Sequence, residues 1–251
     1  MIMNKTQILY PESKETQGIH SYYKKESDKM SEKGFIIGVD NDIYDGIENY
    51  ILRGFFSQVK SVLNKNRTLN WLNSYNSFNK TLCMSEFLNV IKPWTFPTVI
   101  IPELEESAIL KGMEELGCDR VFIKNDYRSL FALSEYASVY PDSKIETIIK
   151  NFKAQNLSGP FMIRKFINEP EIFYNEQRIW VLNGNPHSPY PFKEFVSEAA
   201  KKVYEFSGSK YFTLDIAGDY IVEVNPGETS DRGGDNPLDW FCEIFANEFL
   251  R

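Results

Sequence analysis

The sequence predicts an α+β fold in two parts, and two patterns support this prediction. Short apolar runs typical of strands alternate with longer amphipathic runs typical of helices along the 251 residues. Beyond residue 102 their order is irregular and does not repeat as a strand–helix–strand series. A connector at 93–97, with Pro102 beyond it, is rich in proline, which removes backbone donors. We therefore expect a small α/β domain at 1–101 and an α+β domain at 102–251.

The first domain contains three short runs that we interpret as strands, with helical stretches between and after them. The predicted strands are 7–10, 35–39 and 50–52, and the predicted helices are 18–33 and 57–64.

The second domain begins with a helix at 103–116, which Gly117 ends. A later helix at 192–206 shows one apolar face and ends before Gly208. The remaining elements are strands at 120–124, 160–167, 177–182, 211–216 and 220–224 and helices at 145–152 and 237–249.

The composition excludes several classes of protein. A net charge of −7 disfavours non-specific nucleic-acid binding, which needs clustered Lys and Arg. Three distant cysteines and two histidines are too few for a zinc site. We see no signal-peptide core and no apolar run of about 18–20 residues, the length that spans a bilayer. We expect a cytoplasmic protein without nucleic-acid or membrane partners.

The hairpin at 211–224 gives the most specific indication of chemistry. Glu223 and Asn225 are two residues apart on one strand, so they share a face, and Asp215 lies on the preceding strand. Three such oxygen ligands suit Mg²⁺. Convergence requires an odd loop such as 217–219, because a two-residue turn would place Asp215 on the opposite face. The alternative is an ordinary hairpin whose carboxylates are solvated.

Four cations lie on or at the ends of predicted strands. Lys124 ends an apolar strand, where it could hold phosphates or simply lie at the surface. Arg164, Lys165 and Arg178 lie within strands, where an arginine is costly unless it meets an anion. That anion is either a ligand group or a glutamate of the chain, for which the candidates are Glu169, Glu171 and Glu176.

Several segments resemble the ATP-grasp enzymes. Residues 212–225 resemble their metal-binding hairpin, as in glutathione synthetase, and 175–186 resemble the strand after their adenine hinge. Residues 122–129, with Arg164 and Arg178, are similar to the ATP-grasp clade named for two arginines and a lysine. The resemblance implies an ATP-grasp fold, in which two α+β subdomains grip ATP, preceded by a small α/β pre-ATP-grasp domain.

The resemblance also implies ligand roles for particular residues. Lys124 would contact the ATP phosphates. Glu176 would accept the ribose hydroxyls, with Glu169 and Glu171 as rivals. Arg164 and Arg178 would neutralise the γ-phosphate or an acyl-phosphate. The adenine hinge would comprise Lys165, Phe166 and Ile167, and Mg²⁺ would be held by Asp215, Glu223 and Asn225.

The implied reaction joins a carboxylate to an amine, on a small molecule or a peptide, through an acyl-phosphate formed from ATP. The alternatives are a small-molecule kinase on the same fold and a non-enzymatic nucleotide-binding module. Arg53 and Arg232 are candidates for binding a substrate carboxylate, although each could equally be structural.

Overall fold

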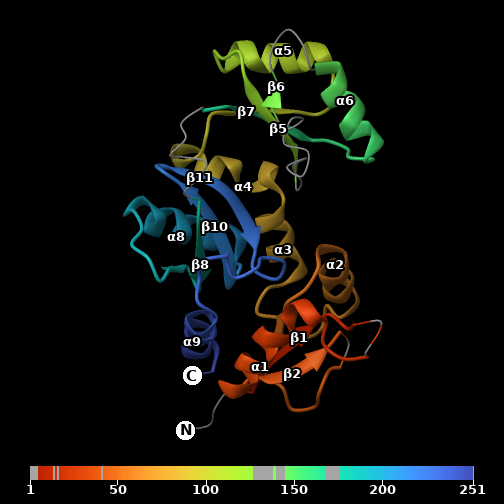
Figure 1. The fold of residues 1–251 in the computed structure, drawn as a ribbon, viewed down its shortest axis with the longest axis vertical. Helices are drawn as coiled ribbons and strands as arrows, with labels where there is room; N and C mark the ends of the chain where they lie inside the picture. Colours follow the sequence, from red (N-terminus) through yellow and green to blue (C-terminus); the bar gives the residue numbers. More distant parts are fainter. Residues whose placement is uncertain are drawn as a thin grey trace. The chain divides into compact units, whose positions relative to one another are not determined.

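Figure 1 shows the computed structural model of the chain, which describes residues 5–13, 15, 17–40, 42–126, 138–139, 145–167 and 176–250. The chain divides into two compact units, and both are discontinuous in sequence. The first comprises 1–81, 177–216 and 223–251, and the second comprises 82–176 and 217–222. The expected boundary between residues 101 and 102 stays a prediction; in this division the first break follows Thr81, and the chain returns to the first unit at Gln177.

The first unit begins with a three-stranded parallel sheet in the order β2-β1-β3. All three predicted strands are present, with Ile8 of β1 paired to Ile37 and Ile51. The helix α3 was not predicted, because its sequence carries few large apolar residues. The elements are β1 (Thr6–Tyr10), η1 (Ser21–Tyr23), α1 (Lys24–Glu32), β2 (Ile36–Val39), β3 (Asn49–Leu52), α2 (Phe56–Lys65) and α3 (Tyr75–Leu82).

A four-stranded sheet in the order β11-β10-β8-β9 carries the predicted hairpin. The strands β10 and β8 are antiparallel, and their register sets Asp215 opposite Arg178. Aromatic rings of Trp180 and Tyr211 pack against Phe245 of α9. The elements are β8 (Gln177–Leu182), β9 (Asn185–His187), α8 (Phe195–Ser207), β10 (Tyr211–Ala217), β11 (Tyr220–Pro226) and α9 (Leu238–Phe249).

The second unit contains an antiparallel four-stranded sheet in the order β4-β7-β5-β6. Figure 1 shows α5 and α6 beside this sheet, and their buried residues form one cluster with β5 and β7. The strand β4 was not predicted; it lies between the expected connector at 93–97 and Pro102. The elements are α4 (Met84–Ile91), η2 (Lys92–Trp94), β4 (Thr98–Ile101), α5 (Glu106–Glu115), β5 (Val121–Asn125), β6 (Ser138–Val139), α6 (Ile145–Ala154) and β7 (Phe161–Lys165).

Within the described parts of the chain, no helix combines the length and the apolar character that crossing a membrane requires.

Candidate active site

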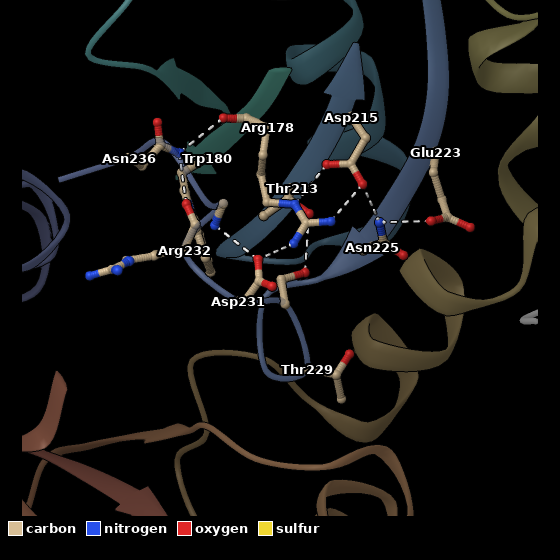
Figure 2. A network of polar contacts seen from close by, with 12 residues as sticks. Arg178, Trp180, Thr213, Asp215, Glu223, Asn225, Thr229, Asp231, Arg232 and Asn236 are labelled. Carbon is tan, nitrogen blue, oxygen red and sulfur yellow. Dashed lines mark hydrogen bonds and ion pairs between the residues drawn. The ribbon is translucent and has the colours of Figure 1, made fainter. Parts of the chain in front are cut away.

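The side chains of Asp215, Glu223 and Asn225 meet on the β10–β11 hairpin of the first unit. Asn225 Nδ2 donates hydrogen bonds to Asp215 Oδ2 at 3.0 Å and to Glu223 Oε2 at 3.2 Å. Figure 2 shows the three side chains pointing toward one another. The Asp215 side chain is only 2% exposed, whereas Glu223 and Asn225 are half-buried and line a pocket. The predicted convergence of these three side chains is confirmed.

The connection between the two strands is shorter than predicted. The strand β10 continues through Ala217 and β11 begins at Tyr220, so only Gly218 and Asp219 lie between them. Gly218 has a φ of 60°, a conformation that glycine adopts without steric cost and that permits a tight turn. The predicted three-residue loop was therefore wrong, although Asp215 still lies within reach of Asn225.

Arg178 holds Asp215 from the neighbouring strand. Its Nε and Nη2 donate to the two Asp215 carboxylate oxygens at 2.7 and 2.8 Å, and its Nη1 pairs with Asp231. This two-point geometry fixes the carboxylate more firmly than a single contact would. Arg178 also lines the pocket beside Asn225. Its described contacts are with carboxylates of the chain, and its predicted contact with a phosphoryl group stays a prediction.

The two members of this ion pair have shifted pKa values. Burial raises the pKa of Asp215, although the hydrogen bonds and charge of Arg178 oppose this shift. Burial would lower the pKa of Arg178, but Asp215, Asp231 and Glu223 raise it above its ordinary value. Arg178 therefore stays charged, and it is the cation that stabilises a nearly buried carboxylate.

The loop after β11 is attached to β8 by hydrogen bonds. Asn236 Nδ2 donates to the carbonyls of Arg178 at 3.2 Å and Arg232 at 2.7 Å. Trp180 Nε1 also donates to the Arg232 carbonyl, at 3.1 Å. Gly233 has a φ of 85°, and a Cβ atom there would lie 3.0 Å from Arg178 Cβ, so the close approach requires glycine. These contacts fix the backbone at Arg232.

The donor atoms of the hairpin fit a magnesium ion. Mg²⁺ prefers carboxylate and amide oxygens, and a half-turn of the Asn225 amide would present its oxygen beside those of Asp215 and Glu223. In the described part of the chain, no group of three or more His, Cys, Asp or Glu residues forms a metal site. The candidate site thus depends on Asn225 as its third ligand.

A pocket of about 240 Å³ adjoins these residues, and we call it the metal-side pocket. It is lined by Glu223, Asn225, Arg178 and Asp231 on one side and by aromatic rings on another. The rings of Tyr22, Tyr23 and Phe55 contact one another, with centroid separations of 5.0 to 6.3 Å. The pocket therefore places an aromatic wall beside oxygen ligands.

Arg53 does not face this pocket. It is 1% exposed, and its Nε and Nη2 donate to the two Glu26 oxygens at 2.9 and 3.1 Å. Its Nη1 donates to the carbonyls of Ser230, at 2.7 Å, and Gly227. Of the two roles that the sequence left open for Arg53, these contacts favour the structural one, because a carboxylate of the chain already occupies its guanidinium.

The cations Lys124 and Arg164 lie in the second unit, and both are 4% exposed. Lys124 is on β5, opposite Met162 of β7. Arg164 donates to the Val222 carbonyl and to Thr95 Oγ1, both at 2.7 Å. These contacts bind Arg164 to neighbouring parts of its own unit. The predicted role of Arg164 at the γ-phosphate and the predicted phosphate binding by Lys124 both stay predictions.

The predicted nucleotide hinge follows β7 in the same unit. The guanidinium carbon of Arg120 lies 3.7 Å from the centroid of the Phe166 ring. The backbone N–H of Phe166 donates a hydrogen bond to the Arg120 carbonyl. Lys165 and Ile167 on either side are half-buried, and Glu176 is exposed. Glu169 and Glu171, the rival ribose ligands, lie outside the described residues, so the choice among the three stays open.

Two features of the site were missed by sequence reasoning. Asp231, which pairs with Arg178 Nη1, was not predicted as a site residue. The aromatic wall had a signal in the Tyr22–Tyr23 pair and in Phe55, but no local pattern connects them to the hairpin more than 150 residues away.

No protein-family model matches the sequence, and no curated protein sequence matches it. Solved structures, however, match nearly the whole chain. The D-cycloserine synthetase DcsG has a TM-score of 0.69 and 10% identity over 97% of this chain and 99% of that one. The macrocyclase MdnC from Microcystis aeruginosa MRC, bound with its precursor peptide MdnA, has a TM-score of 0.68 and 12% identity over 98% and 99%.

A third similar structure is the ATP-grasp ligase PsnB complexed with a minimal precursor, Mg and ADP. It has a TM-score of 0.63 and 10% identity over 97% of both chains. The chain therefore has the ATP-grasp fold, and the predicted α+β fold class is confirmed. Membership of the clade named for two arginines and a lysine stays a prediction.

Proposed function

We propose that the chain is an ATP- and Mg²⁺-dependent ligase that joins a carboxylate to an amine through an acyl-phosphate. The observation that carries this proposal is the meeting of Asp215, Glu223 and Asn225 beside a pocket, on an ATP-grasp fold. Similar structures include ATP-grasp ligases, one of them complexed with Mg and ADP. The peptide bound to MdnC supports a peptide as one class of substrate.

In the proposed reaction, a substrate carboxylate oxygen attacks the γ-phosphorus of ATP and ADP leaves. The amine nitrogen then attacks the carbonyl carbon, phosphate leaves and the nitrogen loses a proton to water. Asp215, Glu223 and Asn225 hold Mg²⁺, which supplies positive charge against the phosphate oxygens.

The other residues position the reactants. Arg178 orients Asp215. Lys124 contacts phosphate oxygens, and Glu176 accepts the ribose hydroxyls. Lys165, Phe166 and Ile167 form the adenine hinge. Much of the rate enhancement then comes from holding two reactants close and in line.

The test measures the thermal unfolding midpoint with ATP, with and without Mg²⁺, for the wild type and Glu223→Gln. Saturation at about 100 times Kd adds roughly 2.7 kcal/mol of stability, which raises the midpoint by about 5–10 °C. We expect a Mg²⁺-dependent rise that Glu223→Gln abolishes. Glu205→Gln, an exposed change on α8, is the matched control and should keep the full rise.

The absence of any rise with nucleotide would contradict the proposal and favour a non-enzymatic module. If nucleotide binds, product analysis separates a ligase from a kinase. A ligase releases phosphate only when carboxylate and amine are both present, whereas a kinase transfers phosphate to a hydroxyl acceptor without an amine.

A further inference from the structure

A second pocket in the first unit, of about 230 Å³, lies next to the metal-side pocket. We call it the Arg232 pocket. Tyr22 and Asp231 line both pockets, so the two pockets are adjacent. The Arg232 pocket is also lined by Lys25, Glu26, Arg232 and the Gly233–Gly234 pair. The proposed reaction assigns this pocket no ligand.

The two acidic side chains of the Arg232 pocket already form ion pairs with arginines that are not part of its lining. Glu26 pairs with Arg53 through both carboxylate oxygens and also accepts a hydrogen bond from Tyr10. Asp231 pairs with Arg178 and accepts the Gly233 N–H at 2.9 Å. Neither carboxylate therefore needs a cation from the pocket.

The two basic side chains are in the opposite situation. Neither Lys25 nor Arg232 forms an ion pair or a side-chain hydrogen bond with any residue that the structure describes. Figure 2 shows the Arg232 side chain pointing away from Asp215 and Asn225, while its carbonyl is held by Trp180 and Asn236. The Arg232 pocket is thus lined by two cations without a described counter-ion. These two positive charges favour an anionic ligand group.

The start of α9 adds to this positive potential. Leu238, its first residue, lines the Arg232 pocket, and the preceding Pro237 provides no side-chain cap. The N–H groups at a helix N-terminus carry a partial positive charge that attracts anions.

The lining of the metal-side pocket contains more acidic than basic groups. Without Mg²⁺, Arg178 lies against the carboxylates of Glu223 and Asp231, which leaves one negative charge in excess. An ammonium group is favoured there by charge and by the rings of Tyr22 and Phe55, which attract cations to their faces.

We propose that the two pockets together bind a zwitterionic amine substrate, an amino acid or the C-terminal residue of a short peptide. Its amine enters the metal-side pocket, and its carboxylate binds Lys25 and Arg232. A carboxylate matches the flat two-point fork of an arginine guanidinium. This inference rests on the proposed ligase function and specifies its amine substrate.

The test is an NMR titration of the full ¹⁵N-labelled chain without nucleotide, so it does not depend on ATP binding. The probes are pairs of compounds that differ only in the carboxylate: glycine and glycinamide, L-leucine and L-leucinamide, L-phenylalanine and L-phenylalaninamide. We expect at least one amino acid to shift the Arg232 Nε–Hε and Gly234 N–H signals. The Kd of the corresponding amide should be at least fivefold higher. The wild-type spectrum is assigned at Arg232 by the signal lost in Arg232→Gln.

Lys25→Gln and Arg232→Gln should each weaken the binding at least fivefold. Lys24→Gln is the matched control, because Lys24 is the neighbouring lysine on α1 and pairs with Asp28. It should bind like the wild type. The inference would be overturned by amides that bind as tightly as the acids, by no binding in any pair, or by Lys25→Gln and Arg232→Gln proteins that bind normally. Tighter binding of inorganic phosphate than of every amino acid would also overturn it.

These outcomes are separate from the test of the proposed function. A Mg²⁺-dependent shift with ATP and no response to amino acids would refute the substrate assignment and leave the ligase proposal intact. Amino-acid binding without any response to nucleotide would refute the ligase proposal.

Discussion

Arg178 and Asp215 form a two-point ion pair across the β8–β10 register, with N–O distances of 2.7 and 2.8 Å. The Asp215 side chain is almost completely buried, and Arg178 is the cation that pairs with it in the described part of the chain. The pair therefore contributes both to the stability of the sheet and to the orientation of a proposed metal ligand.

Arg178→Lys tests whether the two-point geometry matters beyond the charge. A lysine keeps the charge but cannot reproduce the planar fork, so one charged hydrogen bond to Asp215 is lost. We expect the free energy of unfolding in urea to fall by about 1.5–3 kcal/mol, the range for a hydrogen bond to a charged group. The Mg²⁺-dependent midpoint shift should also weaken.

The matched control is Arg67→Lys, because Arg67 also makes two contacts to one residue, Asn64, but at an exposed position. Its effect should stay within about 0.5 kcal/mol. Equal losses in the two variants would show that the buried geometry around Arg178 has no special importance.

Glu26→Ala tests the structural role assigned to Arg53. The variant leaves a guanidinium that is 1% exposed without its carboxylate, and breaking a buried ion pair in this way costs about 3–5 kcal/mol. Urea unfolding should show that loss. Glu32→Ala on the same helix removes an exposed partner of Lys29 and should change stability by less than about 1 kcal/mol. A loss below about 1 kcal/mol for Glu26→Ala would contradict the structural role.

Glu228 should make the protein less stable as the pH rises. It is 0% exposed, neither carboxyl oxygen has a hydrogen-bond partner within the described structure, and burial raises its pKa to about 8 from 4.5. Its own N–H, Asn73 and Arg53 oppose this shift but do not cancel it. The Asn73 amide is near Glu228, but its hydrogen bond goes to the Tyr211 carbonyl, at 2.8 Å.

The sign of the effect follows from the two pKa values. Below pH 4.5 the carboxyl is protonated in both states, so it causes no pH dependence. Between pH 4.5 and 8 the unfolded chain loses this proton while the folded chain keeps it, so stability falls by about 1.4 kcal/mol per pH unit. The loss reaches roughly 5 kcal/mol above pH 8.

Glu228→Gln removes this titration. We expect the variant to gain stability over the wild type as the pH rises from 5 to 8, measured by urea unfolding at each pH. Glu205→Gln should follow the wild type. A difference between Glu228→Gln and wild type that does not change with pH would show that Glu228 keeps the same charge in both states.

The hairpin was predicted from the sequence because its information is local. Asp215, Glu223 and Asn225 lie within eleven residues, and strand alternation places Glu223 and Asn225 on one face. The strand β4 was missed because Pro97 and Pro102 flank its four residues, and proline normally marks the end of a strand.

The burial of Arg53 could not be predicted, because its partner Glu26 is 27 residues away on another element. The contact between Arg178 and Asp231 spans 53 residues and depends on a loop whose path follows from the Arg232 and Asn236 hydrogen bonds. Such contacts arise from the packing of distant elements, which no short pattern encodes.

At position 232 the structural contribution is made by the backbone carbonyl, which accepts hydrogen bonds from Trp180 and Asn236, while the side chain extends into a pocket. Every residue type has the same backbone carbonyl. A substitution at position 232 can therefore change the side chain that lines the pocket while the loop keeps these two hydrogen bonds. Related proteins that differ at this position could therefore have diverged in substrate preference by single steps, each of which leaves a folded protein.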